Sequence, residues 1–187
     1  MACSAEERIE SKDIPRPSAE GDSLNEKEIT FFLNGEEVTA SVPVRMHAAD
    51  FLRHRLGMTG THVGCEQGVC GMCTILLAGG AVKSCLLLAV QLDGVEVWTV
   101  ESLGEDDQLN ELQAAFKRHH ALQCGFCTPG FLMTATGLKA RSAGRALSRR
   151  EIREELAGVL CRCTGYEGII LAVEEYLDHG DNEGNPL

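Results

Sequence analysis

Residues 29–100 alternate between hydrophobic and polar positions over short stretches, which is typical of β-strands. The stretches 29–33 and 38–42 both alternate, and Asn34-Gly35 between them is a strong signal for a tight hairpin turn. The remaining elements predicted here are a helix over 48–56 ended by Gly57, a second hairpin over 74–77 and 81–85, and a strand over 95–100. Together these elements predict a small mixed sheet with a helix across it.

After residue 102 the hydrophobic period changes from two to about 3.6 residues, which indicates amphipathic helices. Four helices are predicted, beginning near Leu109, after Thr128 as N-cap, after Ser148 and after Thr164. Ser148 with Glu151, and Thr164 with Glu167, have the spacing of a capping box. The pattern therefore predicts an α+β chain whose second part is helical.

The composition argues against some classes of binding partner and against a membrane location. Of the 187 residues, 44% are hydrophobic, and the formal net charge of −11 argues against nucleic acid or an anionic membrane as partner. No stretch approaches the ~20 apolar residues that span a bilayer, and the N-terminus has no apolar signal core. We therefore expect a cytoplasmic protein without a membrane segment. Residues 1–26 are charged, lack hydrophobic periodicity and predict a flexible tail.

Eight of the nine cysteines form two groups of four. The first group is Cys65-x4-Cys70-x2-Cys73-x11-Cys85. This is the spacing of plant-type [2Fe–2S] ferredoxins. Gly64, Gly68 and Gly71 lie beside these cysteines, and glycine allows a backbone to wrap tightly and aim N–H groups at sulfur. Zinc prefers paired Cys-x2–4-Cys units around one ion, so this spacing favours an iron–sulfur cluster over zinc.

The second group is Cys124-x2-Cys127 followed by Cys161-x-Cys163. Cys-x2-Cys alone is shared by zinc ribbons, redox dithiols and iron–sulfur sites. A dithiol would leave Cys161 and Cys163 unexplained, and Cys-x-Cys is unusual for zinc. Rieske ligation needs two histidines, whereas all six histidines lie outside both groups, and we expect none of them to bind metal. Cys3 is expected to be a free thiol.

Three motifs together resemble the iron–sulfur subunit of the xanthine oxidase family of molybdenum hydroxylases. They are Gly64-Cys-Glu-Gln-Gly-Val-Cys-Gly-Met-Cys73, Gln123-Cys-Gly-Phe-Cys-Thr-Pro-Gly130 and Leu160-Cys-Arg-Cys-Thr-Gly-Tyr166. The resemblance covers about residues 27–178. It implies an N-terminal plant-type ferredoxin (β-grasp) domain followed by an all-α four-helix domain. The corresponding division is a tail at 1–26, a ferredoxin domain at 27–102, a helical domain at 103–180 and a C-terminal tail at 181–187.

The resemblance also implies the cofactors, the partners and the role of each site. Cys65, Cys70, Cys73 and Cys85 would hold the [2Fe–2S] cluster nearer a flavin, and Cys124, Cys127, Cys161 and Cys163 the one nearest a molybdenum cofactor. The side-chain amide of Gln123 would hydrogen-bond the pterin of that cofactor. A large molybdopterin-binding subunit and a medium FAD-binding subunit would complete a hetero-oligomer. Met72 departs from the small residue common at its position, which we expect to change packing at the first cluster.

The function implied is an electron relay within a molybdenum-dependent oxidoreductase, with no catalytic residue in this chain. Electrons would come from substrate oxidation in the large subunit and leave to FAD or another acceptor. One alternative is a free-standing ferredoxin-like shuttle or redox sensor, although a shuttle needs only one exposed cluster. Another is a zinc-stabilised interaction module, against which the Cys-x4-Cys and Cys-x-Cys spacings argue. The substrate pocket would lie in another chain.

Overall fold

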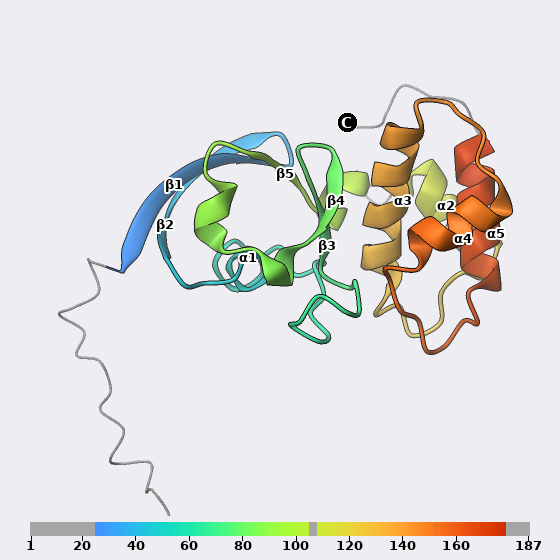
Figure 1. Cartoon of the computed structure of the whole chain (residues 1–187), viewed down its shortest axis with the longest axis horizontal. Coiled ribbons are helices and arrows are strands. Elements are labelled where there is room, and N and C mark those ends of the chain that lie inside the picture. The colour runs from blue at the N-terminus through green and yellow to red at the C-terminus, as the bar shows by residue number, and fades with distance from the viewer. Residues whose placement is uncertain (1–24, 105–107, 179–187) are drawn as a thin grey trace, which may run out of the picture.

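The computed structural model describes residues 25–104 and 108–178. The predicted C-terminal tail, Cys3 and all but the last two residues of the predicted N-terminal tail lie outside these ranges. Figure 1 shows a sheet-containing part beside a helical part, with β3, β4 and α3 at the junction between them. The chain is thus an α+β protein, as the hydrophobic pattern predicts.

Five strands form one mixed sheet in the order β2-β1-β5-β3-β4. They are β1 (Glu26–Leu33), β2 (Glu36–Pro43), β3 (Thr74–Leu77), β4 (Gly80–Lys83) and β5 (Glu96–Trp98). Strand β5 lies parallel to β1 and antiparallel to β3, and both hairpins are antiparallel. Asn34 and Gly35 both have positive φ, 53° and 86°, which is the tight turn that the dipeptide predicts.

Two predicted strands are shorter than expected. β4 ends at Lys83 because Ser84–Leu86 turns into a 3₁₀ helix that carries Cys85. β5 ends at Trp98, and Val100–Leu103 forms another 3₁₀ turn. The turn after β4 packs against α1, and the turn after β5 packs against α3.

The helix predicted over 48–56 is present but irregular. α1 (Ala48–Asp50) continues directly as a π-helical segment, Phe51–Arg55. The N–H of Leu56 accordingly bonds to the carbonyl of Phe51, five residues back, at 3.2 Å. Gly57, with φ 74°, ends the segment as predicted. Because hydrophobic spacing does not distinguish hydrogen-bond registers, the π-helix was not predictable from the pattern.

The helical part contains α2 (Glu111–Arg118), α3 (Thr128–Ser142), α4 (Arg149–Leu156) and α5 (Glu167–Asp178). α3 packs against β3. The packing is so close that a Cβ added to Gly137 of α3 would lie 2.8 Å from the Leu76 side chain of β3. One buried hydrophobic cluster fills the helical part and a second fills the sheet-containing part. Within the described ranges, no helix is both long enough and apolar enough to cross a bilayer.

Two of the predicted helix caps are wrong. Cys127, not Thr128, is the N-cap of α3, and the Thr128 hydroxyl is buried without a hydrogen-bond partner among the described residues. α5 begins at Glu167, so Thr164 is too far upstream to cap it. The capping box of Ser148 and Glu151 is confirmed. Gly165 and Tyr166 both have positive φ, so the chain between Thr164 and Glu167 is not helical.

Two candidate metal centres

The first cysteine group lies where the loop before β3 meets the turn after β4. Cys65, Cys70 and Cys73 come from the loop, and Cys85 comes from the 3₁₀ turn. The N–H and hydroxyl of Ser84 both donate to the Cys73 carbonyl, at 3.1 and 2.7 Å, which fixes the turn against the loop. The sequence-predicted ligands of this group are therefore brought together from two segments.

Backbone N–H groups in the loop point at sulfur. The N–H of Cys70 lies 3.3 Å from Cys65 Sγ. The N–H groups of Gln67 and then Cys70 lower the pKa of the Cys65 thiol from 9.0 to about 7. Gly68 and Gly71 have φ of 78° and 75°, the left-handed backbone that lets the loop curl around the sulfurs. This loop favours thiolates, the form in which cysteine binds iron.

The first group is also well enclosed. Cys70, Cys73 and Cys85 are buried, and Cys65 is half-buried. Burial, followed by the contact with Cys73, raises the pKa of Cys85 from 9.0 to about 11. Buried thiolates without a compensating charge are costly, and bound metal ions remove that cost.

The second cysteine group lies at one end of the helical part. Cys127 caps α3, and Cys161 and Cys163 come from the segment between α4 and α5. Cys124 Sγ and Cys163 Sγ are 3.5 Å apart, and both residues are exposed. Cys127 is buried beside Cys161, and burial is the main reason that its pKa rises to about 12. The second group is therefore closed on its inner side and open on its outer side.

The cysteines of both groups approach one another in pairs. In the first group Cys65 contacts Cys70 and Cys73 contacts Cys85; in the second Cys124 contacts Cys163 and Cys127 contacts Cys161. In the described residues, no three or more potential ligands are close enough together to bind one metal ion. A [2Fe–2S] cluster takes four thiolates, two on each iron, so a paired arrangement of sulfurs fits its needs.

Tyr166 positions Cys161, a role that the sequence pattern missed. Its hydroxyl accepts the N–H of Cys161 at 2.9 Å, while its ring packs edge-on against Phe131 in the helical core. Tyr166 has φ 69°, a conformation that costs energy for any residue except glycine. The Thr164 hydroxyl lies 3.1 Å from Cys161 Sγ. The position of Tyr166 three residues after Cys163 was the sequence signal that could have indicated its hydrogen bond with Cys161.

The two centres adjoin each other through the backbone. The N–H of Leu160, next to Cys161, donates to the carbonyl of Cys70 at 2.9 Å. A Cβ on Gly71 would lie 2.2 Å from the Gly158 carbonyl oxygen, so only glycine permits this approach. One hydrogen bond therefore connects a residue of the first group to the neighbour of a residue of the second.

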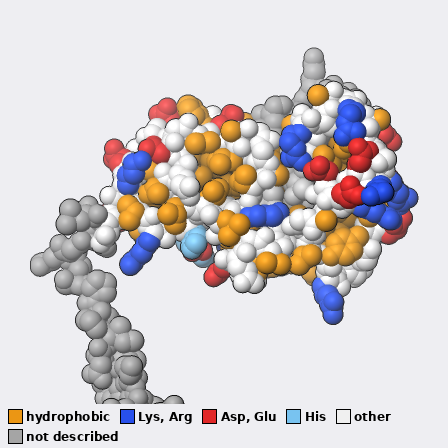
Figure 2. Space-filling view, in the orientation of Figure 1, with side chains coloured by type: hydrophobic (Ala, Val, Ile, Leu, Met, Phe, Trp, Pro, Cys, Tyr) orange, Lys and Arg blue, Asp and Glu red, His pale blue; other side chains and the backbone are white. Residues whose placement is uncertain are grey.

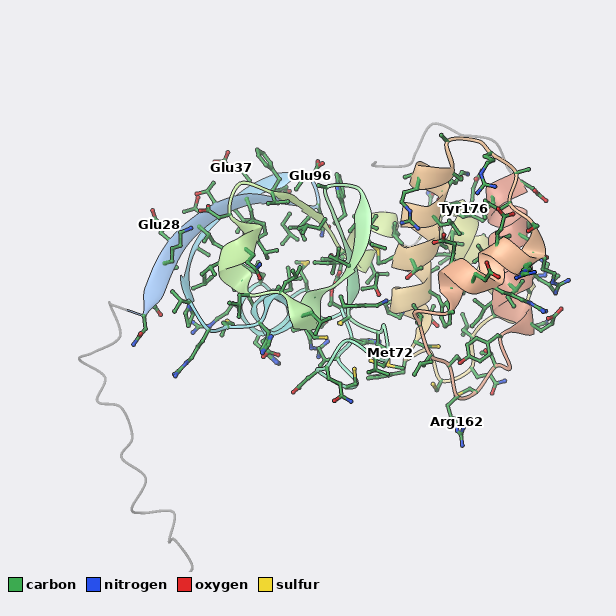
Figure 3. The ribbon with its side chains drawn as sticks, in the orientation of Figure 1. Glu28, Glu37, Met72, Glu96, Arg162 and Tyr176 are labelled. Atoms are coloured by element: carbon green, nitrogen blue, oxygen red, sulfur yellow. The ribbon has the colours of Figure 1, made fainter. Side chains whose placement is uncertain are left out.

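A second contact crosses the junction at the side chains. The rings of His62 and Phe126 stack with their centroids 4.8 Å apart, and His62 Nδ1 lies 2.8 Å from the Phe126 carbonyl oxygen. Met72 lies at the same junction (Figure 3), where it packs against the helical core and its Sδ would be 2.8 Å from a Cβ on Gly64. The long Met72 side chain thus fills space between the two parts.

The surface around the second group is open and carries exposed apolar side chains. Leu122, Phe126 and Leu160 are exposed hydrophobic residues, and Gln123 is exposed beside Cys124. Arg162 points away from the helical part (Figure 3). Figure 2 shows the charged side chains of the helical part gathered elsewhere, where arginines of α3 and α4 pair with glutamates of α4 and α5. The open side of the second centre is therefore not part of that ion-pair network.

Comparisons with known proteins agree with this geometry. The family model described as "2Fe-2S iron-sulfur cluster binding domain" matches residues 31–103, and the one described as "[2Fe-2S] binding domain" matches residues 99–174. The two models each contain one of the cysteine groups.

Named relatives cover most of the chain. The nicotine 6-hydroxylase small subunit of Paenarthrobacter nicotinovorans is 54% identical over 78% of this chain and 87% of its own length. The caffeine dehydrogenase subunit gamma of a Pseudomonas species is 52% identical over 78% and 88%. The structure of quinoline 2-oxidoreductase from Pseudomonas putida 86 matches with a TM-score of 0.77 and 51% identity, over 83% of this chain and 98% of the matched chain. The chain belongs to the [2Fe–2S]-binding small subunits of the xanthine oxidase family of oxidoreductases.

Proposed function

We propose that the two cysteine groups hold one [2Fe–2S] cluster each and that the chain relays electrons between two partner subunits. The ligands are Cys65, Cys70, Cys73 and Cys85 for the first cluster, and Cys124, Cys127, Cys161 and Cys163 for the second. The observation that carries the proposal is the hydrogen bond from Leu160 N–H to the Cys70 carbonyl, which joins the two sites directly. When bound, the clusters supply one-electron transfer.

The protein residues supply support, enclosure and a fixed spacing. The buried sulfurs of the first group exclude water from that centre, and Tyr166 fixes the chain at Cys161. Because Gly71 fits closely against Gly158, the two centres cannot slide relative to each other without losing that contact. This arrangement suits a relay, in which the protein positions the cofactors and performs no bond chemistry itself.

The open face of the second centre is the surface on which we propose that a large, molybdopterin-binding subunit docks. Leu122, Phe126 and Leu160 are exposed there, as is Cys124, and exposed apolar surface of this kind marks interaction sites. Gln123 lies on this face, where its amide would hydrogen-bond the pterin. Exposed Val69 and Leu86 beside the first centre would face a medium, FAD-binding subunit.

The finer division of the chain is also part of the proposal. We propose a ferredoxin domain at 27–102 and a four-helix domain at 103–180. Each has a hydrophobic cluster, and the cluster of the helical domain also takes in Leu76 and Trp98 from the sheet. We place the complex in the cytoplasm. Relatives are named for nicotine, caffeine and quinoline, all nitrogen heterocycles, so we propose an N-heterocyclic substrate for the complex. Its pocket would lie in the large subunit.

A matched pair of substitutions tests the docking face. Leu122 and Phe32 are 45% and 46% exposed, but Phe32 lies on β1, away from both cysteine groups. Leu122→Asp is expected to weaken co-purification of the large subunit about tenfold or more, because it places a charge in an apolar interface. Phe32→Asp is expected to leave co-purification unchanged. Equal behaviour of both variants, with the iron content intact, contradicts this assignment of the face.

A further inference from the structure

Lys83 places a positive charge beside the first cysteine group. It is the last residue of β4 and lies two positions before Cys85. Its Nζ donates to the Thr74 hydroxyl at 3.0 Å, and that hydroxyl donates to the Gly71 carbonyl at 2.6 Å. The chain of two bonds fixes the ammonium group to the loop between Cys70 and Cys73.

The same ammonium group lies at the junction of the two parts. A Cβ added to Gly71 would be 3.0 Å from Lys83 Nζ, and one added to Gly158 would be 3.5 Å from it. The side chain is half-buried there. Lys83 therefore lies between the loop that carries Gly71 and the segment that carries Gly158 and leads to Cys161.

The sulfurs of the first cysteine group act electrostatically on Lys83. Burial lowers its pKa, and the sulfurs of Cys73, then Cys70 and Cys85, act in the opposite direction. A cation in a partly buried position is screened less than one in water, so its field at these sulfurs is stronger than that of a fully exposed lysine. The cost of burying a lysine is reduced by hydrogen bonds and by negative charge nearby.

A bound cluster would be that negative charge. With four thiolates, an oxidised [2Fe–2S] cluster carries a charge of about −2, and reduction adds one more negative charge. A neighbouring cation stabilises the reduced form more than the oxidised form, because its attraction grows with the charge on the cluster. The effect is larger for the nearer of two clusters.

We propose that Lys83 is a tuning residue that raises the reduction potential of the first cluster relative to the second. The inference rests on the proposed function, in which both clusters are present and electrons pass from the second to the first. The charge of Lys83 makes that direction more favourable. It does so without contacting substrate.

Three substitutions separate charge from structure. Lys83→Met keeps the apolar stem and removes the charge, and Lys83→Gln keeps a donor for Thr74. Lys83→Arg keeps the charge. Lys27→Met is the matched control, because Lys27 carries the same charge on β1, which β5 and β3 separate from β4, and it pairs there with Asp93 at 2.8 Å.

The experiment is a potentiometric titration of the intact complex, with each [2Fe–2S] signal followed by low-temperature EPR. For Lys83→Met and Lys83→Gln, the equilibrium constant for electron transfer from the second to the first cluster is expected to fall about tenfold, equivalent to about 59 mV for one electron. Lys83→Arg and Lys27→Met are expected to stay within about twofold of the native protein. Unchanged potentials in both neutral variants, or an equal shift in Lys83→Arg, overturn the proposal.

Iron and sulfide counted on the same samples keep this test separate from the test of the relay itself. A native complex without a full complement of two clusters overturns the proposed function. A full complement with no shift in the neutral variants overturns only the role of Lys83. Lys83→Gln serves as the second neutral variant where Lys83→Met assembles its clusters poorly.

Discussion

The two cysteine groups differ in how far this chain completes them. In the first group Cys70, Cys73 and Cys85 are buried, and the loop's own N–H groups point at sulfur. In the second group Cys124 and Cys163 are exposed among apolar side chains. The first centre is largely enclosed within the chain, whereas the second is open on its outer side. An electron relay benefits from this difference, because an open centre can approach an electron donor closely.

The largest expected effect comes from removing one ligand in each group. Cys73→Ser is expected to lose the first cluster, about half of the iron, and to destabilise the sheet-containing part, since metal binding contributes to folding there. Cys124→Ser is expected to lose the other half of the iron with a smaller loss of stability, because this residue is exposed. Iron content and thermal unfolding measure both effects. Equal destabilisation by the two variants contradicts the difference in enclosure.

The next largest effect is expected from disrupting the close contact between the two centres at Gly71. Gly71→Ala would put a Cβ 2.2 Å from the Gly158 carbonyl oxygen, at a backbone φ of 75°. We expect a loss of about 3 kcal/mol in the free energy of unfolding, from strain and lost contact together. Gly79→Ala is the control, since it has φ 79° but no atom within 4 Å of the added Cβ.

The control is expected to cost about 1 kcal/mol, the strain alone. Denaturant unfolding of both variants, with the clusters bound, gives the difference. If Gly71→Ala costs no more than Gly79→Ala, the close approach of the two parts does not contribute to stability.

A smaller change acts on the second centre alone. Tyr166→Phe removes the hydroxyl that accepts the Cys161 N–H, which is expected to cost about 1 kcal/mol. The second cluster should then lose iron to a chelator several-fold faster, while the first cluster loses iron at its native rate. The two clusters are distinguished by their EPR signals during chelation. Equal acceleration at both clusters contradicts a local role for Tyr166.

The smallest effect concerns the N-terminus of α4, away from both centres. Arg145, and then Ser148, lower the pKa of Glu151 from 4.5 to about 2. Because the folded-state pKa is lowered, Glu151 stabilises the fold above about pH 4.5, and this stabilisation is lost as the pH falls toward 2. Glu151→Gln should therefore unfold more easily than the native chain at pH 6, and the difference should shrink by pH 3. Thermal unfolding at both pH values measures it, with the cluster potentials expected to be unchanged.

The sequence predicted the structure most reliably where a short motif strongly favours one local conformation. Asn34-Gly35 forms the expected turn because both residues tolerate positive φ, and Ser148 caps α4 because its hydroxyl meets the N–H of Glu151. The grouping of the eight cysteines also followed from spacing. Thr128 and Thr164 were mispredicted as caps, because Cys127 and Tyr166 occupy the last positions before α3 and α5.

What spacing could not predict is how the two groups meet. The hydrogen bond from Leu160 to Cys70 joins residues distant in sequence, and neither residue carries a recognisable signal for it. Lys83 likewise looks like an ordinary residue at the end of a strand until Gly71 and Gly158 are brought beside it. Such features depend on tertiary packing, which a periodic pattern of hydrophobic residues does not specify.

The most direct test of the relay is low-temperature EPR of the natively purified, anaerobically reduced complex, with metals counted on the same sample. We predict two distinct [2Fe–2S] signals together with molybdenum, and loss of only one signal in Cys73→Ser and only the other in Cys124→Ser. A single signal in the native complex, or zinc in place of iron at either cysteine group, would contradict the assignment of two clusters to this chain.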